Sequence, residues 1–232
     1  MALFRAPWDS FPALSVQATD SAVRSHPAYA AASAGDPAAA ADLVSSFFRP
    51  DNIPLLPESI DCVVPVLRSG ASQAIASALA AVTATFLRAR VCSSIQEVSQ
   101  FPPSPPTSLA RLVNQPVFAG SAPAGRCLLV SAHAAYGSAI ANLRGFLMHH
   151  GCVVAHAHAL CADFTATRLV PDPFTIGALR ARFEPEIPLL VQSLGFEPEF
   201  LTNREALFVY SLPSLDRLSD PSLPAALTFR PN

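Results

Sequence analysis

The sequence predicts a single α/β domain built on a parallel sheet. Two short apolar runs, at 61–67 and 126–130, are typical of strands that are covered on both faces. Each run is followed by a short loop and a helical stretch, and an alternating run at 152–160 follows the second of these helices. This order is that of βαβ units with right-handed crossovers. A chain of 232 residues is long enough to bury such a core.

The first part of the chain is expected to lead into the sheet through helices. Residues 1–25 show no periodicity and predict an irregular N-terminal arm. Two alanine-rich helices follow from His26. Gly35 is placed to end the first, and Asp36 to cap the second. Pro37 then occupies the first helical position, where a missing N–H costs nothing.

The central part of the chain alternates strands and helices. We expect a helix over 71–88 after the first strand, and a further strand within 91–98. The proline-rich stretch 100–107 predicts a loop with polyproline character. A helix over 139–150 follows the second strand, with Gly151 placed to end it.

The remaining sequence predicts helices and then a frayed end. Apolar residues at helical spacing mark 174–182 and 185–194. Thr202 and Glu205 form a capping box that opens a helix to about residue 210. The expected organisation is therefore the arm, a domain over 26–218 and a flexible tail over 219–232.

Composition and charge limit the classes of partner. A net charge of −2 favours neither nucleic acid nor a membrane as a partner. All 15 basic residues are arginine, so no lysine can contact phosphate or form a Schiff base. The stretch 70–87 is uncharged but too polar for a membrane span. The apolar composition is compatible with a homodimer, although no stripe localises its interface.

The cysteines and the N-terminal sequence predict a cytoplasmic, soluble protein. The five cysteines are odd in number and contain no C-x-x-C, which argues against a disulfide framework and for a reducing compartment. The first residues lack the unbroken apolar run of a signal peptide.

The loop after the second strand predicts a phosphate site. There a buried strand ends in a loop containing Gly137, and a helix follows. Backbone N–H groups and the positive end of the helix dipole then point at the same place. Ser138 offers a further hydroxyl donor. The predicted phosphate-binding loop comprises Ser131, Ala132, His133, Ala134, Ala135, Tyr136, Gly137, Ser138 and Ala139.

This segment resembles the phosphoribosyl-pyrophosphate motif of type I phosphoribosyltransferases, where a hydrophobic strand runs into two adjacent acids, a Thr/Gly-rich loop and a helix. The runs RLVNQPVFAGSAPAGRCLLV and GSAIANLRGFLMHHGCVV are similar to bacterial phosphoribosyltransferase-like proteins of unassigned substrate. So are HPAYAAASAGDPAAAADLV and LTNREALFVYSLPS, and the resemblance covers about 26–218.

The resemblance implies a fold and a second loop. The fold is a type I phosphoribosyltransferase-like parallel sheet flanked by helices, with N-terminal and C-terminal helical additions. The run VPVLRSG resembles the strand of the pyrophosphate loop in uracil-type enzymes. This similarity assigns Arg68, Ser69 and Gly70 to a pyrophosphate loop.

The sequence departs from the family at the acids. The acid pair, which in the family holds the ribose hydroxyls and helps to bind the magnesium-loaded substrate, falls on Ser131 and Ala132. The last Thr of the loop falls on Ala139, and no carboxylate occurs between Val98 and Ala162. Each lost charge-assisted hydrogen bond removes roughly 1.5–3 kcal/mol from sugar binding. The oxocarbenium-like transition state loses stabilisation as well.

Two functions remain open at this point. The first is transfer of phosphoribosyl from phosphoribosyl pyrophosphate to an unknown acceptor, impaired by the missing acids and needing Mg²⁺ only if it is active. The second is non-catalytic phosphate or nucleotide binding in a regulatory protein. Either ligand is a small phosphate or phosphoribosyl compound, and the sequence assigns no catalytic residue.

Other polar side chains have a plain structural alternative. His133 could stand in for an acid, and Tyr136 could stack on a base, but both also suit ordinary loop positions. A metal-binding structural module is a third hypothesis, but its residues match no established zinc spacing, and we assign no metal site. These residues are His149, His150, Cys152, His156, His158 and Cys161.

Overall fold

The structure is a computed structural model that describes residues 3–8, 13–54, 56, 59–68, 73–98 and 108–219. Its centre is a five-stranded sheet whose neighbouring strands all run parallel, in the order β1-β7-β6-β2-β3. These strands are β1 (Ser15–Val16), β2 (Cys62–Pro65), β3 (Arg90–Val91), β6 (Arg126–Ala134) and β7 (Val153–Ala162). A separate antiparallel pair consists of β4 (Gln96–Glu97) and β5 (Phe118–Ala119).

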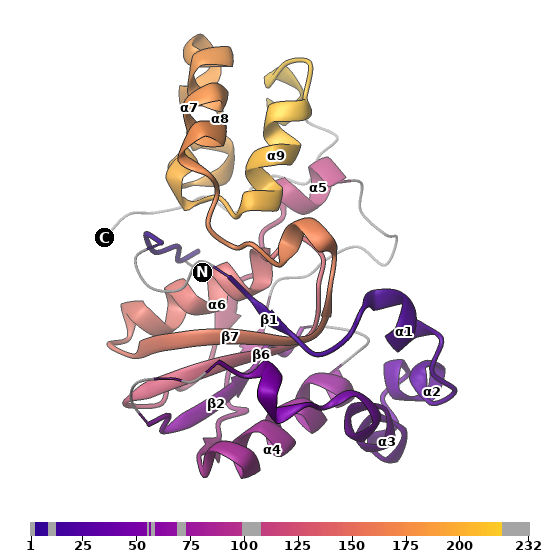
Figure 1. Ribbon diagram of the computed structural model, residues 1–232. Coiled ribbons are helices and arrows are strands. Elements are labelled where there is room, and N and C mark those ends of the chain that lie inside the picture. The colour runs from indigo at the N-terminus through magenta and orange to yellow at the C-terminus, as the bar shows by residue number, and fades with distance from the viewer. Residues whose placement is uncertain are drawn as a thin grey trace.

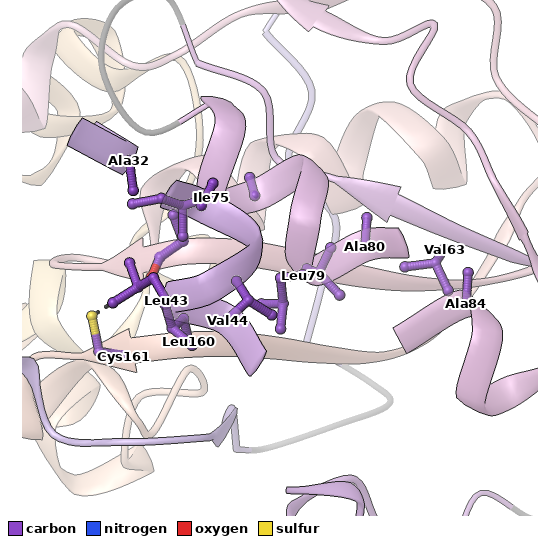
Figure 2. Close-up of a cluster of buried hydrophobic side chains, with 14 of the residues drawn as sticks. Ala32, Leu43, Val44, Val63, Ile75, Leu79, Ala80, Ala84, Leu160 and Cys161 are labelled. Atoms are coloured by element: carbon purple, nitrogen blue, oxygen red, sulfur yellow. Dashed lines mark hydrogen bonds between the residues drawn. The ribbon is translucent and has the colours of Figure 1, made fainter. Parts of the chain in front are cut away.

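Helices cover both faces of the sheet (Figure 1). On one face lies α6 (Ser138–His149), whose apolar residues pack with those of β6 and β7. On the other face lie α2 (Tyr29–Ser33), α3 (Pro37–Phe47) and α4 (Gln73–Leu87). Figure 2 shows how Leu43, Leu79 and Leu160 from three elements meet in this second core.

The C-terminal helices form an apolar cluster of their own. The helices α5 (Ser108–Val113), α7 (Pro173–Arg182), α8 (Ile187–Leu194) and α9 (Asn203–Ser211) build this cluster beyond α6 (Figure 1). Short 3-10 turns join the elements, at Pro50–Asn52, Phe164–Ala166, Glu184–Glu186, Pro198–Phe200 and Asp216–Ser219. No helix among the described residues is long and apolar enough to cross a membrane.

The helix caps that the sequence predicts are confirmed where a side chain accepts hydrogen bonds from the first turn of its own helix. Asp36 caps α3 by accepting from the N–H groups of the first turn, and Pro37 occupies its first position. Thr202 and Glu205 form the expected capping box of α9. The expected parallel sheet flanked by helices is confirmed in this coarser form. All five cysteines are free thiols.

The expectation of an irregular arm over 1–25 differs from the structure. Strand β1 pairs with β7 inside this range, and the helix α1 (Asp20–Arg24) follows it. Leu14 is buried, and Arg5 reaches a buried carboxylate. A two-residue strand is too short to show a period, and its pairing partner lies far away in sequence.

Two strand boundaries also differ. Strand β6 continues to Ala134 because residues 131–134 stay paired with the end of β7, so that the loop before α6 is shorter than expected. The expected strand within 91–98 is divided between β3 and β4, which belong to different sheets. The expected proline-rich loop and the tail after Ser219 lie outside the described residues, as do Ser69 and Gly70.

Candidate functional site

A cavity of about 390 Å³ lies at the carboxyl ends of β2 and β6. It brings together Arg68, which follows β2, and all of the predicted phosphate-binding loop except Ala132. This is the place where parallel α/β sheets bind ligands in general. The full lining is Arg24, Arg68, Asn114, Pro116, Ser131, His133, Ala134, Ala135, Tyr136, Gly137, Ser138, Ala139 and Ile140.

The two positions that replace the acid pair have different surroundings. Ser131 lines the cavity, and its hydroxyl donates to the carbonyl of His133 over 3.0 Å. Ala132 packs instead in the apolar cluster beneath α4. Only one of the two positions therefore faces a ligand, and a charge at Ala132 would enter an apolar core.

The start of α6 depends on Gly137. This residue has a φ of +77°, a left-handed value, and precedes the helix without a side-chain cap. A Cβ atom there would lie 3.0 Å from Leu169 and 3.3 Å from Thr202. Thr202 also donates its hydroxyl to the carbonyl of Tyr136 over 2.6 Å. The C-terminal helices thus hold the loop against the sheet.

A buried carboxylate occupies the other side of this helix start. Ser138 donates its hydroxyl to Glu205 over 2.6 Å, so this predicted phosphate donor already has an acceptor. Glu205 also pairs with Arg5 at 2.8 Å, and both side chains are buried. Burial favours a raised pKa for Glu205, but Arg5, Ser138 and the Thr202 N–H outweigh it and lower the pKa. The carboxylate is therefore charged, as suits a helix N-terminus.

Sequence reasoning found only part of this network. The capping box identified Glu205 as a partner of Thr202, but nothing local connects it to Arg5, which lies 200 positions away. Gln115 is a second missed member, since it donates to Glu205 and accepts from Arg5 and Asn142. Such pairs need a three-dimensional arrangement to be recognised.

Two arginines line the cavity, each paired with a carboxylate outside the lining. Arg68 pairs with Glu97 at 3.2 Å, and Arg24 pairs with Asp20 at 2.7 Å. Both arginine side chains remain about half exposed, at 54% and 53%. Among the described lining residues none is Asp or Glu. Because exposed ion pairs contribute little stability, the Arg24 guanidinium can reorient toward an anion at low cost. The Glu97 side chain is fully buried, so Arg68 stays beside its carboxylate and offers an anion only the exposed part of its guanidinium.

Tyr136 packs against the C-terminal helices. The guanidinium of Arg204 lies 5.5 Å from the centre of its ring, and Phe208 meets the ring edge-on at 6.3 Å. These contacts show the ring in an ordinary packing role, and stacking on a base stays a prediction.

His133 lies beside acids that the sequence did not place there. Its Nε2 atom is 3.4 Å from Asp20 Oδ1 and 3.3 Å from Asp163 Oδ1. Asp163 directly follows β7, and Asp20 begins α1, so neither falls in the acid-free interval 98–162. Burial favours a raised pKa for Asp20, but its hydrogen bond from Arg24 and the charge of His133 lower the pKa. Burial, aided by Asp20, raises the pKa of the nearby Cys161 thiol to about 12.

The predicted His/Cys cluster does not converge as a set. His156 and His158 make hydrogen bonds to the hydroxyl of Ser15 in β1. His149 stacks on Phe4, with ring centres 4.1 Å apart. The other members also have partners of their own in the described part of the chain. His150 contacts the carbonyl of Phe146, and the Cys152 thiol donates to the carbonyl of Pro123.

Fold and cavity define an α/β protein with an arginine-lined pocket at the carboxyl ends of a parallel sheet. No protein-family model matches the chain. Among curated proteins the chain is similar to Protein TraN of Escherichia coli, with 27% identity over 224 residues. The match covers 93% of this chain and 50% of TraN, so the chain spans about half the length of this relative.

Proposed function

We propose that this chain is a phosphoribosyltransferase-like domain that binds a small phosphate-containing ligand without transferring its sugar. The observation that carries the proposal is the cavity that joins Arg68 and Arg24 to the start of α6. N–H groups at a helix start and guanidinium groups are common ligands of phosphate in proteins. A volume of about 390 Å³ suits a sugar phosphate or a nucleotide.

The strand order supports the finer fold assignment within this proposal. Strands β2 and β6 are neighbours in the sheet, and the loop that follows each of them borders the same cavity. The resemblance to type I phosphoribosyltransferases implies this placement for the pyrophosphate and phosphate loops. Residues Ser69 and Gly70 of the first loop lie outside the described part of the chain.

The same site argues against sugar transfer. Departure of pyrophosphate develops positive charge on the sugar ring, which a nearby carboxylate would stabilise. The lining offers Ser131 at the position of the first acid, and Ala132 lies in the core. A neutral hydroxyl binds a sugar but supplies no charge for this transition state.

Replacement of Arg68 tests the binding proposal. We expect Arg68→Gln to weaken binding of ribose 5-phosphate about tenfold or more, because a charge-assisted hydrogen bond contributes roughly 1.5–3 kcal/mol. Calorimetric titration of inorganic phosphate, ribose 5-phosphate and phosphoribosyl pyrophosphate, each with and without Mg²⁺, measures the effect. The matched control is Arg180→Gln, since Arg180 pairs with Glu197 and Glu199 at the surface, outside the residues that line the cavity.

The pattern of ligands separates the two functions. Binding of all three compounds irrespective of Mg²⁺ is expected of a phosphate-binding domain. Tight binding of phosphoribosyl pyrophosphate that needs Mg²⁺ would instead favour an active transferase. Absence of binding for all three compounds would contradict the proposal.

Replacement of Gly137 tests the loop itself. We expect Gly137→Ala to weaken phosphate binding, because the new methyl group would press on Leu169 and Thr202 and shift the start of α6. Gly151→Ala is the matched control: Gly151 has a similar φ of +80° but nothing within 4 Å of an added Cβ atom. Both variants carry the same backbone strain, so unchanged phosphate affinity in Gly137→Ala would show that this loop is not the binding site.

A further inference from the structure

Three side chains with metal-ligating atoms converge beside the cavity, and none of the three was grouped with the others by the sequence. Asp20 comes from the start of α1, His133 from β6 and Cys161 from β7. Their ligating atoms all lie within 4.8 Å of one another. Among the described residues, these three form the one group of three or more His, Cys, Asp or Glu side chains that is this close. The paired register of His133 and Cys161 on neighbouring strands fixes two of them on a rigid base.

The distances from Asp20 to the other two ligating atoms are those of a tetrahedral site. Bonds of about 2.0–2.3 Å from a central ion to N, O and S atoms separate those atoms by roughly 3.3–3.7 Å. The His133 Nε2 to Asp20 Oδ1 distance is 3.4 Å, and the Cys161 Sγ to Asp20 Oδ1 distance is 3.7 Å. A charge-assisted N–H···O hydrogen bond is shorter, at about 2.7–2.9 Å.

His133 supplies an independent sign that something lies between these groups. Its Nε2 atom is buried and makes no hydrogen bond, although carboxylate oxygens of Asp20 and Asp163 lie at 3.4 and 3.3 Å. Buried ring nitrogens are otherwise almost always hydrogen-bonded. A cation among these atoms would satisfy the nitrogen and the Asp20 carboxylate together.

We infer that Asp20, His133 and Cys161 bind a zinc ion. A thiolate and an imidazole favour Zn²⁺ over Mg²⁺, which prefers oxygen ligands alone. Arg24 supports the site from behind, since it binds Asp20 through Oδ2 and leaves Oδ1 facing the other two ligands. Such outer contacts orient the ligands of metal sites in general.

Three protein ligands leave one position of the zinc ion open. Asp20 and Asp163 border a wide, open cavity of about 800 Å³ on the protein surface. Zinc sites with three protein ligands and one water are the type that performs chemistry or binds a further ligand. The site lies next to the phosphate loop through His133, but its existence does not depend on the proposed function.

The test uses the full chain without an affinity tag, stripped of metal with a chelator. Titration with Zn²⁺ against a chromophoric chelator measures stoichiometry and affinity, and Co²⁺ serves as a visible substitute. We expect one ion per chain, and a thiolate-to-cobalt charge-transfer band in the near ultraviolet. Cys161→Ala should lose this band, and His133→Gln and Asp20→Asn should each weaken zinc binding more than about tenfold.

A matched cysteine variant separates this site from adventitious thiol binding. Cys92→Ser removes a half-buried thiol that does not belong to the converging group, and we expect it to keep both the affinity and the cobalt band. His133 is partly exposed, so His133→Gln carries the test if Cys161→Ala does not fold. Less than half an ion per chain at saturating Zn²⁺, or equal affinity in wild type and His133→Gln, would overturn the inference.

Discussion

Lowering the pH from 7 to 5 is expected to destabilise this protein markedly, because two histidines are buried without charge. Burial lowers the pKa of His156 to about 4, and burial together with His156 lowers the pKa of His158 to about 4, from the usual 6.5. Between these values the unfolded chain binds protons that the folded chain does not. The free energy of unfolding therefore falls as the pH falls through this window. The full effect is roughly 3 kcal/mol per histidine once the pH reaches about 4.

The hydrogen bonds around His158 explain why a charge is not accepted there. Gln17 accepts from the Arg49 N–H through Oε1, so its amide nitrogen donates to His158 Nε2 over 2.8 Å. The neutral ring then carries its proton on Nδ1 and donates to Ser15 over 2.7 Å. Ser15 in turn lies 3.0 Å from His156 Nε2. A proton on His158 Nε2 would place this N–H group against the N–H group of the Gln17 amide in the core.

Chemical denaturation at pH 7.5, 6.5, 5.5 and 5.0 measures this dependence. The double variant His156→Gln/His158→Gln should show a flatter profile than the wild type, while His26→Gln at the surface should keep the full slope. Acids with lowered pKa values, such as Glu205 and Asp20, lose their contribution only as the pH falls below their ordinary values near 4. Measurements above pH 5 therefore isolate the histidines, and equal stability at pH 7.5 and 5.0 would contradict the prediction.

The features predicted from sequence share one property, which is that their cause is local. Asp36 caps the helix that begins one residue later, and Gly137 supplies the left-handed turn before its own helix. Buried parallel strands can be predicted from sequence because both of their faces are apolar, which gives a continuous apolar run. The meeting of Arg68 with the loop before α6 follows from this, since the carboxyl ends of parallel strands share one edge of the sheet.

The features that sequence could not predict depend on distant partners. Ala132 and Ser131 are adjacent small residues, and only the packing of α4 against the sheet shows that one is in the core and the other in the cavity. Asp20 and Asp163 are ordinary acids in sequence until α1 and the end of β7 bring them to His133. The resemblance to the phosphoribosyltransferase motif predicts acids at two positions where this sequence has none. The fold instead brings Asp20 and Asp163 to His133 in the same loop.

Removal of the Glu205 carboxylate is expected to cost about 3–5 kcal/mol of unfolding free energy, the usual loss when one partner of a buried ion pair is deleted. Glu205→Ala would leave Arg5 buried, with 2% of its side chain exposed, and without the carboxylate that balances its charge. It would also remove the acceptors of Ser138 and of the Thr202 N–H. Glu199→Ala is the control, because Glu199 pairs with Arg180 at the surface, where such pairs contribute about 0–1 kcal/mol.

A double variant distinguishes a buried unpaired charge from lost packing. If the cost arises from the uncompensated Arg5, then Arg5→Met/Glu205→Leu should be more stable than Glu205→Ala, because both charges leave the core together. Denaturant unfolding of the three proteins gives the comparison, and a double variant less stable than Glu205→Ala would contradict this account.

Because Glu205 joins α9 to the first residue of α6 through Ser138, the same variants should also loosen the phosphate loop. Phosphate affinity should therefore fall in Glu205→Ala while Glu199→Ala keeps it, which would connect the stability of the C-terminal helices to the function of the cavity.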